Sequence, residues 1–114
     1  MNFFDLHCDT ATVAMKKGAG LSRNGLQLDL AKLGEHRLCQ SYAVFIPDHL
    51  RGDAAWQYFV RCHAYWQGQI AAADDMTLLQ YPADAKESWQ DGKNACFFAV
   101  EGGAVLAGEA EKVS

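Results

Sequence analysis

The sequence predicts an α/β fold in which parallel strands alternate with helices, the order found in β/α barrels. Two observations predict it. The runs at residues 42–46 and 95–100 are apolar without a break, and strands that are apolar on both faces are typical of parallel sheets covered on both sides. Polar side chains also follow the first strand and the 95–100 strand, and in β/α folds ligands collect at the carboxyl ends of such strands.

Length and composition are those of one small globular unit. The chain has 114 residues, half of them apolar, and a formal net charge of −4. Both signs of charge are mixed along the sequence, which disfavours nucleic acid and anionic membranes as partners. No apolar run reaches the roughly 18 to 20 residues that span a bilayer, and Met1 stands close to the first strand. We therefore expect no membrane segment, no secretory leader and a cytoplasmic location.

The cysteines support this expectation. Four are present and none forms a Cys-x-x-Cys pair, which argues against a zinc ribbon or a redox motif. The wide spacing is typical of reduced, mostly buried thiols at Cys8, Cys39, Cys62 and Cys96.

The elements of the first half follow from local signals. A short helix is expected over residues 11–17, ended by Gly18 because glycine tolerates a positive φ. Asp29 can cap a helix over residues 30–37. The apolar strand at 42–46 is stopped by Pro47.

In the second half, residues 54–73 predict the longest helix, because apolar side chains recur there at spacings of three and four. His63 lies beside this stripe and is interpreted as a packing residue. Residues 76–80 predict a short extended connector, 82–90 a helix that begins with a proline, and 95–100 a strand. Residues 108–114 have the composition of a helix beginning without an end signal, so the chain is expected to be truncated.

The most informative segment is the first strand. In a regular strand alternate side chains share a face, so Asp5, His7 and Asp9 are expected on one face. Phe4, Leu6 and Cys8 would then occupy the other. Imidazole and carboxylate groups bind zinc and related ions at sites that stay open to water. The alternative is a solvated strand end in which Asp9 or Thr10 caps the next helix.

A third carboxylate follows the 95–100 strand. Glu101 precedes Gly102 and Gly103, which would let the backbone pass close to a metal cluster and leave the carboxylate room to bridge two ions. The alternative is a solvated residue in a glycine-rich turn. Because both strands would end at the same side of a parallel sheet, we expect His7, Asp9 and Glu101 to meet there.

These motifs resemble the membrane dipeptidase family, also called renal dipeptidase or peptidase family M19. The segments that carry the resemblance are residues 5–10, 28–30, 40–47 and 100–103. It implies a TIM (β/α)8 barrel of the metal-dependent hydrolase type and a zinc-dependent dipeptidase that hydrolyses dipeptides with two Zn²⁺ ions. By this resemblance His7 and Asp9 bind one zinc ion, Glu101 is the catalytic carboxylate that bridges it to the second, and Asp5 orients a ligand.

The resemblance covers residues 1–114 as a single partial domain, the strand-helix-strand-helix-strand opening of the barrel. A full barrel needs roughly 250 residues, and the family's later histidines and basic residue have no counterpart here. His49 follows the 42–46 strand, but nothing in its spacing, or in that of His36, recommends it as a substitute ligand. The alternatives are a catalytically silent or complementing fragment, and another amidohydrolase-like metal hydrolase. The complete protein is a possible homo-oligomer.

Overall fold

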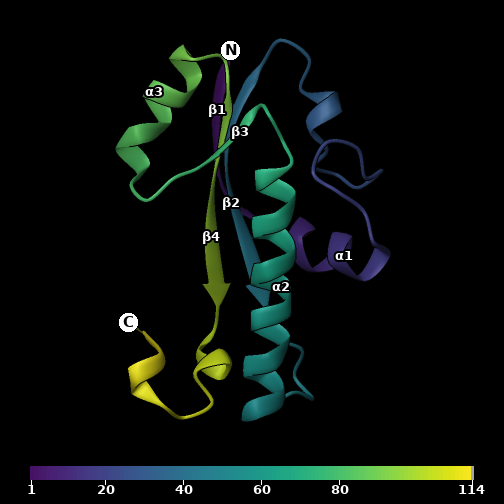
Figure 1. Cartoon of the computed structure of the whole chain (residues 1–114), viewed down its shortest axis with the longest axis vertical. Coiled ribbons are helices and arrows are strands. Elements are labelled where there is room, and N and C mark those ends of the chain that lie inside the picture. The colour runs from purple at the N-terminus through teal and green to yellow at the C-terminus, as the bar shows by residue number, and fades with distance from the viewer. Residues whose placement is uncertain (114) are drawn as a thin grey trace.

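The computed structural model describes residues 1–113 and contains one parallel sheet of four strands in the order β1-β2-β4-β3. Its strands are β1 Asn2–Cys8, β2 Arg37–Phe45, β3 Met76–Leu78 and β4 Asn94–Glu101. The helices are α1 Thr10–Lys17, α2 Asp53–Ala71 and α3 Ala85–Gln90 (Figure 1). The predicted α/β class and the parallel pairing are confirmed.

The sheet has two unlike sides. α1 and α2 cover one side, here called the helix face, which carries the buried Tyr42, Val44 and Cys96 (Figure 1). The other side carries Cys39, Ala95 and Phe97 and is here called the open face, because α3 covers it only beside the starts of the strands. The largest buried side chain is that of Trp66 on α2, which stacks on Tyr42 with ring centroids 4.7 Å apart. The main core therefore lies between the sheet and α2.

The expected three-strand arrangement is wrong in one respect. The segment interpreted as a connector contains β3, which pairs with the beginning of β4 through Met76 and Asn94. The strand expected to be third is therefore β4. Sequence pattern alone could not find β3, because a three-residue strand is shorter than any periodicity test.

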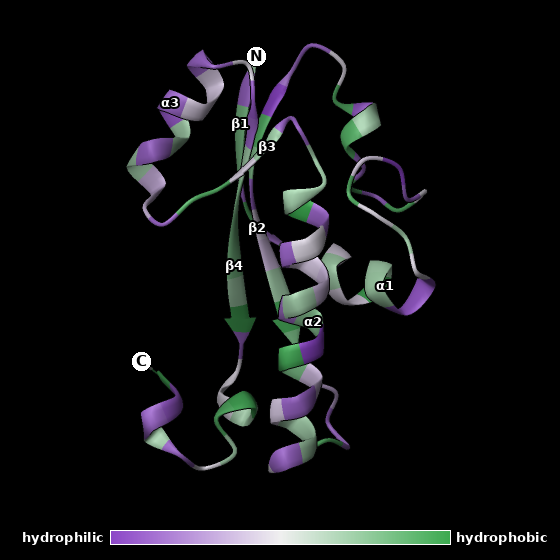
Figure 2. Ribbon diagram, in the orientation of Figure 1, coloured by the Kyte–Doolittle hydropathy of each residue, from purple (hydrophilic) through white to green (hydrophobic). Residues whose placement is uncertain are grey.

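β4 lies between β2 and β3 and is the most regular strand. It pairs with β2 at seven consecutive positions without interruption. Its apolar residues form the green stretch that ends at the arrowhead in Figure 2. The two-faced apolar run predicted at residues 95–100 is confirmed.

The helix predicted over residues 30–37 is wrong. Only the 3₁₀ turn Leu30–Lys32 forms, and β2 begins at Arg37. Asp29 does cap this turn, because its carboxylate accepts a hydrogen bond from the N–H of Ala31 at 3.0 Å. Gly34, with φ of 57°, then breaks the helical path, and pairing with β1 draws the following residues into the sheet five residues earlier than predicted.

The other predicted helices are confirmed with small changes. α1 ends at the left-handed Gly18, whose N–H contacts the carbonyls of Ala14 and Met15. The 82–90 helix divides into the 3₁₀ turn Pro82–Asp84 and α3. In the predicted 108–114 segment, the described residues 108–113 form only the 3₁₀ turn Ala110–Val113, and Ser114 lies outside the described residues. Within residues 1–113, no helix combines the length and the apolar character needed to cross a bilayer.

Candidate metal centre

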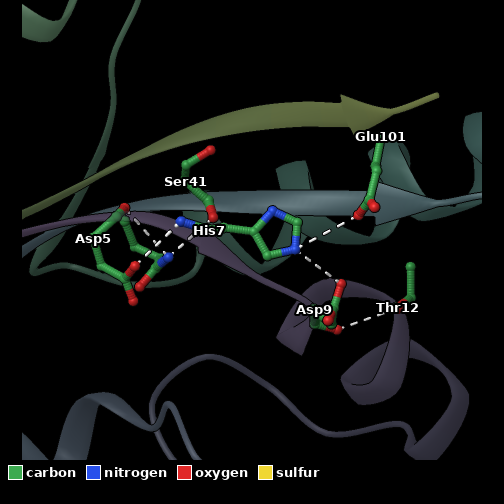
Figure 3. A network of polar contacts seen from close by, with 7 residues as sticks. Asp5, His7, Asp9, Thr12, Ser41 and Glu101 are labelled. Carbon is green, nitrogen blue, oxygen red and sulfur yellow. Dashed lines mark hydrogen bonds and ion pairs between the residues drawn. The ribbon is translucent and has the colours of Figure 1, made fainter.

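Three polar side chains converge at the carboxyl end of the sheet. His7 belongs to the end of β1, Asp9 follows β1 directly, and Glu101 is the last residue of β4. His7 Nε2 lies 3.3 Å from Asp9 Oδ1 and 3.6 Å from Glu101 Oε2 (Figure 3). One potential ligand atom from each residue lies within 4.8 Å of the other two. The predicted meeting of these residues is confirmed, and their role as metal ligands remains a prediction.

The path by which His7 reaches this site differs from the prediction. Asp5 pairs with Gln40 and Cys8 pairs with Tyr42, so three steps along β1 match two steps along β2. This β-bulge breaks the alternation. Asp5 and Cys8 both lie on the helix face with their β2 partners, whereas His7, next to Cys8, lies on the open face with Glu101.

The expectation that Asp5, His7 and Asp9 share one face, with Phe4, Leu6 and Cys8 on the other, is therefore wrong. Cys8 instead packs against the core beneath α1 and α2, and burial raises the pKa of its thiol. A protonated, inward-facing thiol is unsuited to join the ligands. Phe4 contacts Phe97 on the open face, with ring centroids 6.1 Å apart.

Asp9 occupies the N-cap position of α1 without capping it. Its side chain makes no hydrogen bond to the first turn of the helix, and its carbonyl oxygen accepts a bond from Thr12 Oγ1 at 3.2 Å. The alternative in which Asp9 serves α1 through its carboxylate is therefore not what the structure shows. The carboxylate turns to His7 instead.

Glu101 is delivered by the regular end of β4. It pairs with Phe45 of β2, and both side chains lie on the open face. The next residue, Gly102, has φ of 84°, a conformation that side-chain-bearing residues rarely adopt. A Cβ built at Gly102 would meet no atom within 4 Å, so glycine is required there by the turn in the backbone and not by crowding.

Asp5 reaches the site only through the backbone. Its Oδ1 accepts a hydrogen bond from the N–H of His7 at 3.2 Å, and it does not belong to the group of three converging ligands (Figure 3). This contact suits the predicted orienting role, which stays a prediction.

The geometry fits a divalent cation. Two ligand atoms bound tetrahedrally to zinc at 2.0–2.2 Å are roughly 3.3 to 3.5 Å apart. The separation of 3.3 Å lies in this range, and that of 3.6 Å lies just above it. The side chains of His7, Asp9 and Glu101 are about half exposed, at 52%, 63% and 51%, so one side of the cluster is open to further ligands or water.

A hollow of about 480 Å³ adjoins the cluster. One wall consists of Asp5 and residues 7–10, and the other of residues 26–28 in the loop before Asp29. Sequence reasoning did not predict this second wall, because nothing in a loop sequence indicates that it folds back beside β1. The side chains that line the hollow are acidic, neutral or imidazole groups, without Lys or Arg.

The remaining histidines lie elsewhere. His36 contacts the N-terminal amino group at 3.2 Å, and His63 packs against Phe98 with ring centroids 4.9 Å apart, as its predicted packing role requires. His49 lies in the loop after β2, outside the only cluster of three or more potential ligands found in residues 1–113.

The chain was compared with known protein families, curated proteins and solved structures. Residues 1–114 match membrane dipeptidase (peptidase family M19). The searches of curated proteins and of solved structures gave no match. Since the family match spans the whole sequence and the His7, Asp9 and Glu101 side chains converge, the chain belongs to peptidase family M19, a family of metal-dependent dipeptidase-type metallopeptidases with a TIM-barrel fold.

Proposed function

We propose that this chain provides the first part of the active site of a zinc-dependent dipeptidase. In this proposal His7 and Asp9 hold one zinc ion and Glu101 bridges it to a second. The observation that carries the proposal is the convergence of one imidazole and two carboxylates within 4.8 Å, drawn from two separate strand ends. Without a cation, two carboxylates at this distance would repel each other.

Each side chain has a defined task in this site. His7 must be neutral and present Nε2 as the ligand atom, since that nitrogen faces both carboxylates, so its proton belongs on Nδ1. Asp9 and Glu101 supply negative charge, and Glu101 has two oxygens with which to face two ions. When bound, a pair of zinc ions would lower the pKa of a shared water and polarise the scissile carbonyl.

The identity of the metal and of the substrate follows from chemistry and from the family. An imidazole with carboxylates and an open side suits catalytic zinc. The hollow beside residues 26–28 gives room for a small peptide, and a dipeptide is the substrate that we propose. We also propose a cytoplasmic location, for which the widely spaced, unpaired cysteines are the support.

A second candidate function is that of a complementing piece that is silent alone. Two large apolar side chains remain exposed on the open face: 43% for Phe4 and 44% for Phe45. Only three ligands come together in the described part of the chain. We therefore propose that further segments, in the same protein or in a partner, cover this face and supply the remaining ligands.

Metal binding by the 114-residue chain tests the proposal. We expect weak binding of one Zn²⁺ or Co²⁺ in titration calorimetry, no dipeptide hydrolysis, and a tendency to associate through the open face. His7→Ala should weaken binding by more than about tenfold, since losing a ligand costs at least as much as losing a supporting group.

His49→Ala is the matched control, because His49 is exposed in a loop and should leave the affinity unchanged. Equal loss in the two variants, or no loss in His7→Ala, would contradict the assignment of the ligands. Two tightly bound zinc ions with dipeptide hydrolysis by the monomer would overturn the second candidate.

A further inference from the structure

The bulge in β1 determines which face His7 occupies. Leu6 and His7 together lie opposite the single residue Ser41 of β2. If β1 continued the regular pairing that ends at Asp5 and Gln40, His7 would lie opposite Tyr42. Tyr42 is 2% exposed and stacks on Trp66, so the imidazole would enter the apolar core and leave Glu101. The ligand arrangement depends on keeping one extra residue in β1 at this point.

Strand register alone leaves the bulge free to slip, since β1 is an edge strand that pairs only with β2. Its residues Asn2 to Leu6 are all exposed, including Leu6 at 78%. A one-residue slip of β1 would therefore meet little resistance from the packing of these exposed side chains. Something else must fix the position of the extra residue.

Two side chains form hydrogen bonds with backbone groups at the bulge. The N–H of His7 donates to Asp5 Oδ1. The Gln40 amide Nε2 donates to the carbonyl of Ser41 at 3.0 Å and to that of Asp5 at 3.5 Å. Gln40 thus links Asp5, at the start of the bulge in β1, to Ser41, the β2 residue opposite the bulge.

Gln40 is an unusual residue to find at this place. Its side chain is 0% exposed, on a face otherwise packed with apolar groups. Both of its partners are carbonyl oxygens, so the amide can only present its NH₂ to them. Its Oε1 then has no hydrogen-bond partner among residues 1–113, a state that costs free energy and that an apolar residue would avoid.

We propose that Gln40 is a positioning residue, which holds the β1 bulge in register and thereby keeps His7 on the open face with Glu101. Gln40 lies on the helix face and does not belong to the group of three converging ligands. It acts through the carbonyls of Asp5 and Ser41. The consequence for metal affinity rests on the proposed function, whereas the consequence for the register of β1 does not.

Gln40→Met in the 114-residue chain tests this role, because methionine has a similar length and cannot donate. If the bulge slips, Cys8 no longer pairs with Tyr42, and its side chain moves to the open face. We expect alkylation of Cys8, measured by mass spectrometry, to rise several-fold relative to that of Cys62. Cys62 is a residue of α2 that is 0% exposed, so its alkylation reports global unfolding in the same molecule. Co²⁺ affinity should fall about 10- to 100-fold.

Asn94→Leu is the matched control. Asn94 is a second buried amide, 4% exposed, whose Oδ1 accepts a hydrogen bond from the N–H of Leu38 at the opposite end of the sheet. This variant should lower stability while the Cys8 to Cys62 ratio and the Co²⁺ affinity of the folded chain stay at their wild-type values. Equal exposure of Cys8 in both variants would overturn the proposal, as would an unchanged ratio in Gln40→Met.

Deletion of Leu6 gives a second, independent test. Without this residue a regular strand would place His7 opposite Ser41 and Cys8 opposite Tyr42, so no bulge would be needed. We expect Gln40→Met to leave the Cys8 ratio unchanged in this background. A similar rise with and without Leu6 would show that Gln40 acts on general packing. If wild-type protein binds no Co²⁺, the proposed function fails, and the Cys8 ratio still decides the role of Gln40.

Discussion

β1 and β4 deliver ligands to the same site by different means. β4 pairs with β2 at seven successive positions, and alternation along this regular ladder places Glu101 on the open face. β1 is exposed, lies at the edge of the sheet and reaches the site through a bulge. The position of Glu101 is therefore fixed by the backbone ladder, whereas that of His7 depends on a few polar side chains.

This difference between β4 and β1 predicts which substitutions and deletions the site tolerates. In β4 any shift by one residue reverses the faces of all that follows. In β1 the extra residue has already broken the alternation, and hydrogen bonds made by the side chains of Asp5 and Gln40 keep the bulge in its register. We expect the metal centre to be sensitive to register in β4 and to side-chain hydrogen bonds in β1.

The largest effect is expected for Glu101→Gln. The amide keeps the shape of the side chain but lacks the charge that holds two cations together. Dipeptide hydrolysis by a catalytically competent form of the enzyme should fall to background, and Zn²⁺ affinity of the 114-residue chain should fall at least about 100-fold. Glu87→Gln, an exposed change on α3, is the control. Full turnover with normal zinc content in Glu101→Gln would show that Glu101 is not the bridge.

A pair of deletions compares the two strands directly. Removing Ala99 would place Glu101 opposite Val44, which is 0% exposed on the helix face. A carboxylate is not tolerated there without a partner, so we expect a lower unfolding midpoint and loss of Co²⁺ binding. Removing Leu6 should preserve Co²⁺ binding within about tenfold, because His7 stays on the open face. Equal damage by both deletions would contradict the contrast between β4 and β1.

A smaller effect is expected at Asp5. Asp5→Ala removes the acceptor for the N–H of His7 and should weaken Co²⁺ binding about tenfold. Asp5→Asn keeps an acceptor oxygen at the same place, so it should retain most of the affinity. If Asp5→Asn is as weak as Asp5→Ala, then the charge of Asp5 matters more than its hydrogen bond to the backbone.

The smallest effect concerns Asp29, at the end of the loop that forms the second wall of the hollow. Hydrogen bonds from the N–H groups of Asn24 and Gly25 lower the pKa of this carboxyl below its ordinary value of 3.8. A lowered native pKa stabilises the fold above pH 3.8, and this contribution is lost as the pH falls through the native pKa.

Asp29→Asn should therefore lower the urea midpoint at pH 7 and flatten its decline between pH 4 and pH 2, within roughly the range in which carboxyl groups titrate. Asp74→Asn, at an exposed position after α2, should leave both unchanged. The same pH dependence in wild type and Asp29→Asn would show that other carboxyl groups govern acid unfolding.

The sequence by itself determined the α/β class, the long α2 helix, and the strand that carries Glu101. These features depend on local periodicity and on apolar runs, which a chain displays whatever it packs against. The choice of His7, Asp9 and Glu101 as a group also came from the sequence, since parallel strands must bring their carboxyl ends to one side of the sheet.

Only the tertiary structure decided the features that depend on pairing. The helix predicted at residues 30–37 gave way to β2, because β1 supplied a neighbour for Arg37 and the residues after it. β3 exists only because β4 lies beside it. The face of His7 was set by a bulge that alternation cannot reveal, since the extra residue is defined by the strand opposite and by the buried amide of Gln40. Register is a relation between two segments, and one segment read alone does not contain it.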